Sequence, residues 1–288
     1  MINLEKVIKE KYNKLSTGQK KVAEYLIQNK EEFSFKTAAQ IGRRVEVSET
    51  TVIRLSYALG FDGFSEMQSC IQQWVLNHNQ NQSYLTPYQS QAEGQSNGEG
   101  SMSPLMKCME KDMAAIQQTF HQLNEEEMWK VVAKLIEADR VLVIGMRASY
   151  AAAYWLSLQL NTLRDHVSLC PTAGNVSEQL CDLTSRSAVV ILSFPRYLKE
   201  TLHLAECIKD LGVPLICITD RLLSPVGRMA DFTLTTEENV DSNSLSILPA
   251  ISMIDMVISG IMFKDKDRIQ ARQQKLEEIY SSHGVFIE

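Results

Sequence analysis

The stretch KTAAQIGRRVEVSETTVIRLSYALGFDGF, residues 36–64, predicts two short helices separated by a tight turn. Ser48 is a residue type that caps helix N-termini, so we expect the second helix to begin directly after it. Val52, Leu55 and Leu59 then fall at i, i+3 and i+7 and share one apolar face. This pattern is typical of a helix-turn-helix, whose second helix enters the major groove of DNA.

The polar residues of this motif lie away from the predicted apolar face, where they would meet DNA. Thr50 and Arg54 are one turn apart on the second helix. Residues that read base edges from a recognition helix have the same spacing. The capped N-terminus of that helix is suited to a phosphate group. We therefore expect eight residues to contact double-stranded DNA: Lys36, Arg43, Arg44, Ser48, Thr50, Thr51, Arg54 and Tyr57.

The bulk composition indicates a soluble protein of two domains. The chain has 288 residues, of which 44% are hydrophobic and 22% charged. Its first residues, MINLEKVIKEKYNK, lack the apolar core of a signal peptide, and no apolar run approaches the roughly 18 residues of a membrane span. We expect a cytoplasmic protein without a membrane partner.

Cysteine and histidine spacing gives no sign of a metal site or a disulfide framework. None of the six cysteines forms a CxxC pair, and the five histidines show no metal-ligand spacing. We expect reduced thiols, no metal ion and no other cofactor.

The net charge of −6 is divided unevenly along the chain. Residues 1–77 contain eleven Lys and Arg against nine Asp and Glu, a net charge of +2, and the remainder contains eighteen against twenty-six, a net charge of −8. The sign of this difference favours a nucleic-acid surface in the N-terminal part.

A polar segment divides the chain into two predicted domains. Residues 78–103 are rich in Gln, Asn, Ser and Gly and cannot bury enough apolar surface to fold, so they predict a flexible linker. Residues 1–77 read as an all-helical domain, in which Ser16 and Gln19 have the spacing of a capping box. We assign residues 104–288 to a ligand-binding and dimerisation domain.

The second domain alternates short apolar runs with helical stretches. Such a pattern predicts a five-stranded parallel sheet covered by helices on both faces, a flavodoxin-like three-layer α/β sandwich. In this architecture ligands bind at the carboxyl ends of the strands. The predicted strands are residues 141–145, 166–170, 188–194, 214–219 and 231–236, and the predicted helices are 104–123, 125–138, 148–163, 198–212, 245–262 and 265–281.

The segment AAQIGRRVEVSETTVIRLSYALGFDGFSEM resembles the N-terminal domain of RpiR-type transcriptional regulators, and the resemblance extends through residues 1–77. Members of that family carry a C-terminal SIS (sugar isomerase) domain. VLVIGMRASYAAAYWLSLQL is similar to the first strand, turn and helix of a SIS domain, and ICITDRLLSPVGRMADFTL to its later strand–loop–strand. The resemblance implies that the first turn and the loop after the third strand bind a sugar phosphate.

The first of these turns has residues suited to an anion. Ser149 stands at the start of a helix, where backbone donors and the helix dipole attract negative charge, and Arg147 adds a positive charge. With the loop after the third strand, these residues form the expected effector site: Gly145, Arg147, Ser149, Ser193, Arg196, Tyr197 and Thr201.

The loop after the third strand departs from the family pattern. The usual form, Ser-x-Ser-Gly-x-Thr, is replaced by SFPRYL at residues 193–198, so that Pro195, Arg196 and Leu198 stand where the family has Ser, Gly and Thr. Proline has no N–H to donate, whereas the planar guanidinium of Arg196 suits a carboxylate or a more distant phosphate. We expect this loop to bind a small anion in a non-standard manner.

Together these features predict a ligand-responsive transcriptional regulator, not an enzyme, that forms a homodimer or homotetramer. Two alternatives remain. One is a sugar-phosphate isomerase with an accessory helical domain, for which His166, Glu178 and His203 are candidate bases by composition alone. The other is an interaction module whose helical domain serves only for dimerisation.

Overall fold

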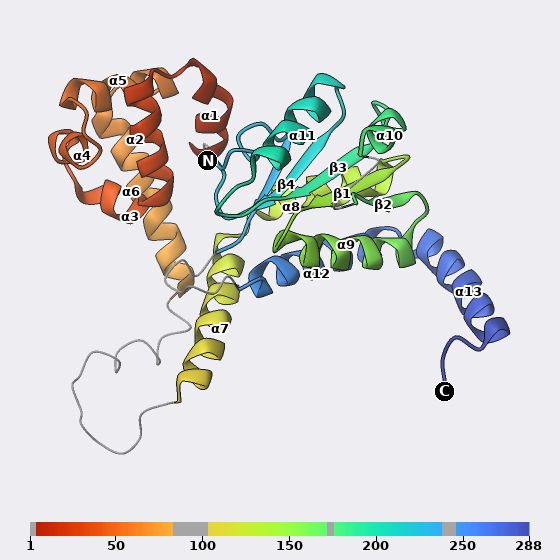
Figure 1. Ribbon diagram of the computed structural model, residues 1–288. Coiled ribbons are helices and arrows are strands. Elements are labelled where there is room, and N and C mark those ends of the chain that lie inside the picture. Colours follow the sequence, from red (N-terminus) through yellow and green to blue (C-terminus); the bar gives the residue numbers. More distant parts are fainter. Residues whose placement is uncertain (1–3, 83–102, 172–175, 238–245, 288) are drawn as a thin grey trace. The chain divides into compact units, whose positions relative to one another are not determined.

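The chain divides into two compact units, Met1–Ser101 and Met102–Glu288 (Figure 1). The computed structural model describes residues 4–82, 103–171, 176–237 and 246–287. Of the predicted linker, residues 83–102 lie outside the described residues, whereas residues 78–82 belong to a helix. None of the described helices is long and apolar enough to span a membrane.

The described part of the first unit is helical, as predicted. Its elements are α1 (Leu4–Lys11), a 3-10 turn (Tyr12–Lys14), α2 (Thr17–Gln28), α3 (Lys30–Phe35), α4 (Ala38–Arg44), α5 (Glu49–Leu59) and α6 (Phe64–Gln82). The capping box of Ser16 and Gln19 is confirmed at the start of α2. The last helix was expected to end near residue 76, but it continues to Gln82 because Gln and Asn side chains do not interrupt a helix.

Helix α3 was not predicted, because its six residues are too few to display a helical period. Two side-chain amides of α6 hold its C-terminal end. The amide of Gln72 donates to the carbonyl oxygen of Ser34 at 2.8 Å, and the amide of Gln68 donates to that of Lys36 at 2.8 Å. These bonds satisfy carbonyl groups that a helix end otherwise leaves unpaired.

The second unit contains the predicted five-stranded parallel sheet. Its order is β2-β1-β3-β4-β5, with every pair of neighbours parallel, which confirms the flavodoxin-like arrangement. The strands are β1 (Val141–Gly145), β2 (Val167–Leu169), β3 (Ala188–Leu192), β4 (Leu215–Thr219) and β5 (Phe232–Thr235). The helices are α7 (Pro104–Gln122), α8 (Glu125–Glu137), α9 (Ser149–Leu163), α10 (Val176–Cys181), α11 (Lys199–Asp210), α12 (Leu248–Lys264) and α13 (Lys266–His283).

Alternate residues of the strands enter two separate apolar cores, one on each face of the sheet. Val143 and Val190 pack in the same core as residues of α8, α9 and α12, whereas Ile144 and Ile191 pack with α11. The three layers are visible in Figure 1, where α9 and α12 lie on one side of the strands and α11 on the other. Because both faces are covered, polar groups of the strands can be presented only at their ends.

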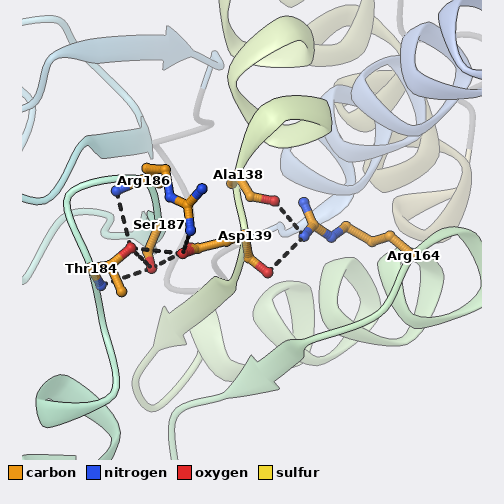
Figure 2. A network of polar contacts seen from close by, with 6 residues as sticks. All are labelled: Ala138, Asp139, Arg164, Thr184, Arg186 and Ser187. Carbon is orange, nitrogen blue, oxygen red and sulfur yellow. Dashed lines mark hydrogen bonds and ion pairs between the residues drawn. The ribbon is translucent and has the colours of Figure 1, made fainter.

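A polar network closes the amino edge of the sheet (Figure 2). Arg164, which directly follows α9, is buried, and its guanidinium donates to the backbone carbonyls of Leu135, Ala138 (2.7 Å) and Asp139 (3.3 Å). It thereby caps the C-terminal end of α8. Burial lowers the pKa of Arg164 from its usual value.

The carboxylate of Asp139 extends this network to the start of β3. It accepts hydrogen bonds from the hydroxyl groups of Thr184 (2.7 Å) and Ser187 (2.7 Å), and Arg186 lies 3.8 Å away. These hydroxyl donors lower the pKa of Asp139. The network ties α8, α9, β1 and β3 together at the edge opposite to the expected effector site.

Candidate functional site

The turn between α4 and α5 depends on Gly42. The N–H of Val47 donates to the carbonyl oxygen of Gly42 at 2.8 Å, and a Cβ atom on Gly42 would lie 2.8 Å from the carbonyl oxygen of Val47. Glu46, inside the turn, has a φ of 57° in the left-handed region. Sequence analysis did not single out Gly42, although a glycine near the end of a predicted helix is a signal of close backbone approach.

Helix α5 begins directly after Ser48, as predicted, and both of its ends are capped. The side chain of Ser48 accepts a hydrogen bond from the N–H of Thr51 at 3.2 Å. At the other end Gly60 has a φ of 97°, and Phe61 N–H donates to the carbonyl of Ser56 at 3.0 Å, which closes the helix. The predicted apolar face of α5 is buried, with Val52 fully covered.

Six of the eight expected DNA-contacting residues are exposed on α4, on α5 and at the N-cap of α5. Tyr57, a large aromatic residue, is 58% exposed. The six residues are Arg43, Arg44, Ser48, Thr50, Arg54 and Tyr57.

Lys36 and Thr51 are placed differently from the expectation. Lys36 is partly buried and its ammonium group pairs with the carboxylate of Glu32, which lowers the pKa of Glu32. The hydroxyl of Thr51 lies 2.9 Å from that of Ser48, and a Cβ on Gly18 of α2 would lie 3.0 Å from the Thr51 methyl. The ammonium group of Lys36 is therefore engaged by Glu32 within the unit, and the Thr51 side chain lies close to α2.

The second set of expected residues lies at the carboxyl edge of the sheet. A Cβ on Gly145 would lie 2.6 Å from both the Ala153 side chain and the Ser149 carbonyl, so only glycine allows β1 to pass this closely to α9. Arg147 is exposed with a φ of 54°, and Ser149 is buried. The N–H of Ser149 donates to the carbonyl of Met146 at 3.2 Å, so this donor is already engaged in a turn.

The loop after β3 keeps a glycine-like backbone although the glycine is replaced. Arg196 has a φ of 62° and an exposed side chain. Arg196 thus adopts the left-handed conformation that glycine favours. Ser193 and Thr201 are both buried, and the Ser193 carbonyl accepts a hydrogen bond from the Thr219 hydroxyl at 2.6 Å.

Tyr197 is held by residues that follow β4. Its hydroxyl donates to the carboxylate of Asp220 at 2.5 Å, and the Arg221 guanidinium lies 5.7 Å from the centre of its ring. Burial raises the pKa of Tyr197 well above its usual value, and Asp220 adds to this effect. Sequence analysis missed Asp220 and Arg221, although their position directly after a buried strand is a usable signal.

Residues after β5 complete this edge and were also missed. Thr236 is buried, and its hydroxyl has no hydrogen-bond partner among the described residues. The N–H of Glu237 donates to the hydroxyl of Thr119 on α7 at 2.8 Å, and its carboxylate accepts from the Gln122 amide at 3.3 Å. Burial raises the pKa of Glu237, and the charge of Asp220 raises it further.

Comparison with protein families identifies two domains. The helix-turn-helix domain of the rpiR family matches residues 2–78, and the SIS domain matches residues 134–260. An uncharacterised HTH-type transcriptional regulator of Haemophilus influenzae is 23% identical over 269 residues, which are 92% of this chain and 91% of the relative.

Two solved structures share the fold. The sugar isomerase domain of an RpiR transcription factor from Sphaerobacter thermophilus is 25% identical, with a TM-score of 0.59, over 62% of this chain and 99% of that chain. The NanR protein of Vibrio vulnificus, complexed with ManNAc-6P, is 16% identical, with a TM-score of 0.56, over 99% of this chain and 100% of that chain.

We expect Gly42→Ala to destabilise the first unit by about 1–3 kcal/mol, because the added methyl group collides with the Val47 carbonyl. Urea unfolding of the full chain, followed by circular dichroism, measures the loss. The matched control is Gly63→Ala, whose Cβ would meet only the Tyr57 hydroxyl, at 3.8 Å. Equal stability of the two variants would contradict this account of the turn.

We expect Glu237→Gln to raise the melting temperature at pH 7. Because burial raises the pKa of Glu237, its negative charge opposes folding at neutral pH, and this penalty disappears once the unfolded carboxyl is also protonated. The gain should therefore shrink as the pH falls and vanish below about pH 4. Thermal melts across this range, with the exposed Glu277→Gln as control, test it; a gain that does not depend on pH would show that charge is not the cause.

Proposed function

We propose that this chain, an RpiR-type transcriptional regulator with an rpiR-family helix-turn-helix domain followed by a SIS domain, binds operator DNA and responds to a small anionic metabolite. The observation that carries the proposal is the exposed polar face of α5 within the domain that matches the rpiR family. The described residues of the first unit leave that face uncovered.

The DNA contacts are assigned to the six exposed residues of α4 and α5. Thr50 and Arg54 reach base edges from successive turns of α5, while Arg43 and Arg44 meet phosphates beside the groove. The backbone carbonyl of Arg54 accepts a hydrogen bond from the Gln19 side chain at 3.2 Å. Helix α2 therefore fixes the backbone from which Arg54 reaches the DNA.

The effector site is assigned to the carboxyl edge of the sheet. Arg147 and Arg196 supply positive charge there, and both have a left-handed backbone conformation. The carboxylates of Asp220 and Glu237, near the same edge, are acceptors for hydroxyl groups. We propose a sugar phosphate or a carboxylate-bearing carbohydrate derivative as effector, the class to which the ManNAc-6P of the NanR complex belongs.

We propose a regulatory rather than an enzymatic role for the SIS domain. His203 is on an exposed part of α11, 3.7 Å from Glu206, and Glu178 is exposed on α10. His166 precedes β2 at the amino edge of the sheet, where its carbonyl accepts from Val141 N–H at 2.9 Å. The three candidate bases lie on or beside different elements, and His166 lies at the amino edge, opposite to the expected effector site, which favours binding over turnover. A sugar-phosphate isomerase remains the alternative.

A regulator of this kind acts as a homodimer or homotetramer in the cytoplasm, where its operator is. Two DNA-binding units joined through the second units would meet half-sites roughly 34–36 Å apart. An effector that binds two arrangements of the copies with different affinity would change this spacing.

We expect Arg54→Ala to weaken binding to operator DNA about 5- to 150-fold, because one base contact contributes about 1–3 kcal/mol. The measurement is fluorescence anisotropy on genomic fragments that the wild-type chain selects. Lys275→Ala removes the same charge from an exposed position on α13 and serves as control. Equal effects of the two variants, or no selected fragments at all, would argue against the DNA-reading role of α5.

We expect Arg196→Ala to weaken effector binding at least tenfold, because a charge-assisted hydrogen bond contributes about 1.5–3 kcal/mol. A thermal-shift screen of sugar phosphates and sugar carboxylates finds the ligand, and calorimetry measures the loss. Arg186→Ala, at the opposite edge of the sheet, is the control. Sugar-phosphate binding that is unaffected by Arg196→Ala would exclude the proposed binding mode, and turnover of the ligand would favour the isomerase.

A further inference from the structure

Helix α7 presents a row of exposed apolar side chains that no described residue covers. Its members have the alternating spacing of three and four residues that is typical of a helix-pairing seam. We call this row the α7 seam: Met106 (52% exposed), Met109 (62%), Met113 (65%), the partly buried Ile116, and Phe120 (63%).

A different side of α7 attaches it to the rest of the second unit. Ala115 and Thr119 are buried, and Thr119 both donates to the Ala115 carbonyl at 2.8 Å and accepts from the N–H of Glu237 at 2.8 Å. The helix also packs against α12. Helix α7 is therefore attached to the second unit through its inner side, and the seam on its other side is exposed all the same.

We infer that the α7 seam is an interface with a second copy of this chain, formed by the α7 helices of the two copies. A two-fold interface uses the same surface on both subunits, and a single row of a- and d-type positions is complementary to its own copy. Methionine and phenylalanine are enriched in interface cores, and the flexible methionine side chain adapts to an opposing helix.

The area of the seam is near the lower limit for a specific interface. With about 200 Å² for a large side chain, the four exposed members offer about 500 Å² per copy. A pair of copies would then bury about 1,000 Å², the size at which specific interfaces begin. Flanking residues would add to this area.

The position of α7 in the chain also favours a second copy. The helix starts directly after Ser103, its N-cap, on the side of the chain that leads to the DNA-binding unit, and it precedes the SIS match, which begins at residue 134. Pairing through α7 would join two copies at the segments that carry their DNA-binding units. The proposed pairing of α7 thus deepens the proposed function. Its biological purpose rests on that function, whereas its physical basis is the exposed seam alone.

The test is the mass of the full-length chain by sedimentation velocity, without DNA or effector. We expect Met113→Lys to raise the dissociation constant of the affected assembly at least tenfold, so that the mass halves at a concentration where the wild-type chain is paired. Met113 is largely exposed, so the variant should still fold, with the far-UV circular dichroism spectrum of the wild-type chain. Met113→Leu should keep the wild-type mass.

The matched control is Gln118→Lys, which places the same charge on an exposed position of α7 outside the seam. Its mass should equal that of the wild-type chain. A monomeric wild-type chain, or a Met113→Lys variant with unchanged mass, would overturn the inference. In the second case the seam is not the interface between copies.

Failure of this inference can be told apart from failure of the proposed function. If Met113→Lys leaves the mass unchanged while the wild-type chain still selects DNA fragments, the α7 seam is not the interface, but the proposed DNA-binding function is retained. If Met113→Lys halves the mass while no DNA is selected, the seam is an interface in a protein with another role.

Discussion

Burial of the parallel sheet on both faces is the constraint on which the second unit depends. All five residues of β1, β3 and β4 are buried, so their side chains alternate between two apolar cores and leave no polar surface along the strands. Chemistry is thereby confined to the two ends of the sheet. At the amino edge, the Arg164 and Asp139 network uses its polar groups for capping and for joining elements. The carboxyl edge has exposed arginines and half-buried carboxylates. It also has the buried hydroxyl of Thr236, which makes no hydrogen bond to a described residue.

Much of this architecture could be predicted from the sequence, because continuous apolar runs mark strands that are buried on both faces. The helix-turn-helix was equally readable, since Ser48 and the buried period of α5 are local signals. What could not be predicted depends on contacts between distant parts. Periodicity gave no indication that Gly18 brings α2 against Thr51, or that Thr119 holds Glu237, the second residue after β5 and 118 positions away. Lys36 pairs with Glu32 only because α3 forms, and α3 was too short to be recognised.

The loop after β3 shows how a substitution can change chemistry and preserve shape. A non-glycine residue in the left-handed region costs about 1–2 kcal/mol, so surrounding structure must hold it there. At Arg196 that support includes Tyr197, fixed to Asp220, and Ser193, fixed to Thr219. The loop therefore keeps a glycine-like backbone conformation, but it presents a long cationic side chain where the family pattern has glycine. Strain of this kind concentrates at functional sites, and Arg147 shows it at the same edge.

The attachment of α7 beside Glu237 has a mechanical consequence. The helix has 19 residues, which at about 1.5 Å per residue make a rod roughly 28 Å long. Thr119 and Gln122, its contacts with Glu237, lie near one end, and Ser103 lies at the other. A tilt of about 5° at the Glu237 end would displace the Ser103 end by about 2.5 Å, given that length. The helix can thus act as a lever that converts a sub-ångström adjustment at the sheet into a displacement comparable to the size of an atom.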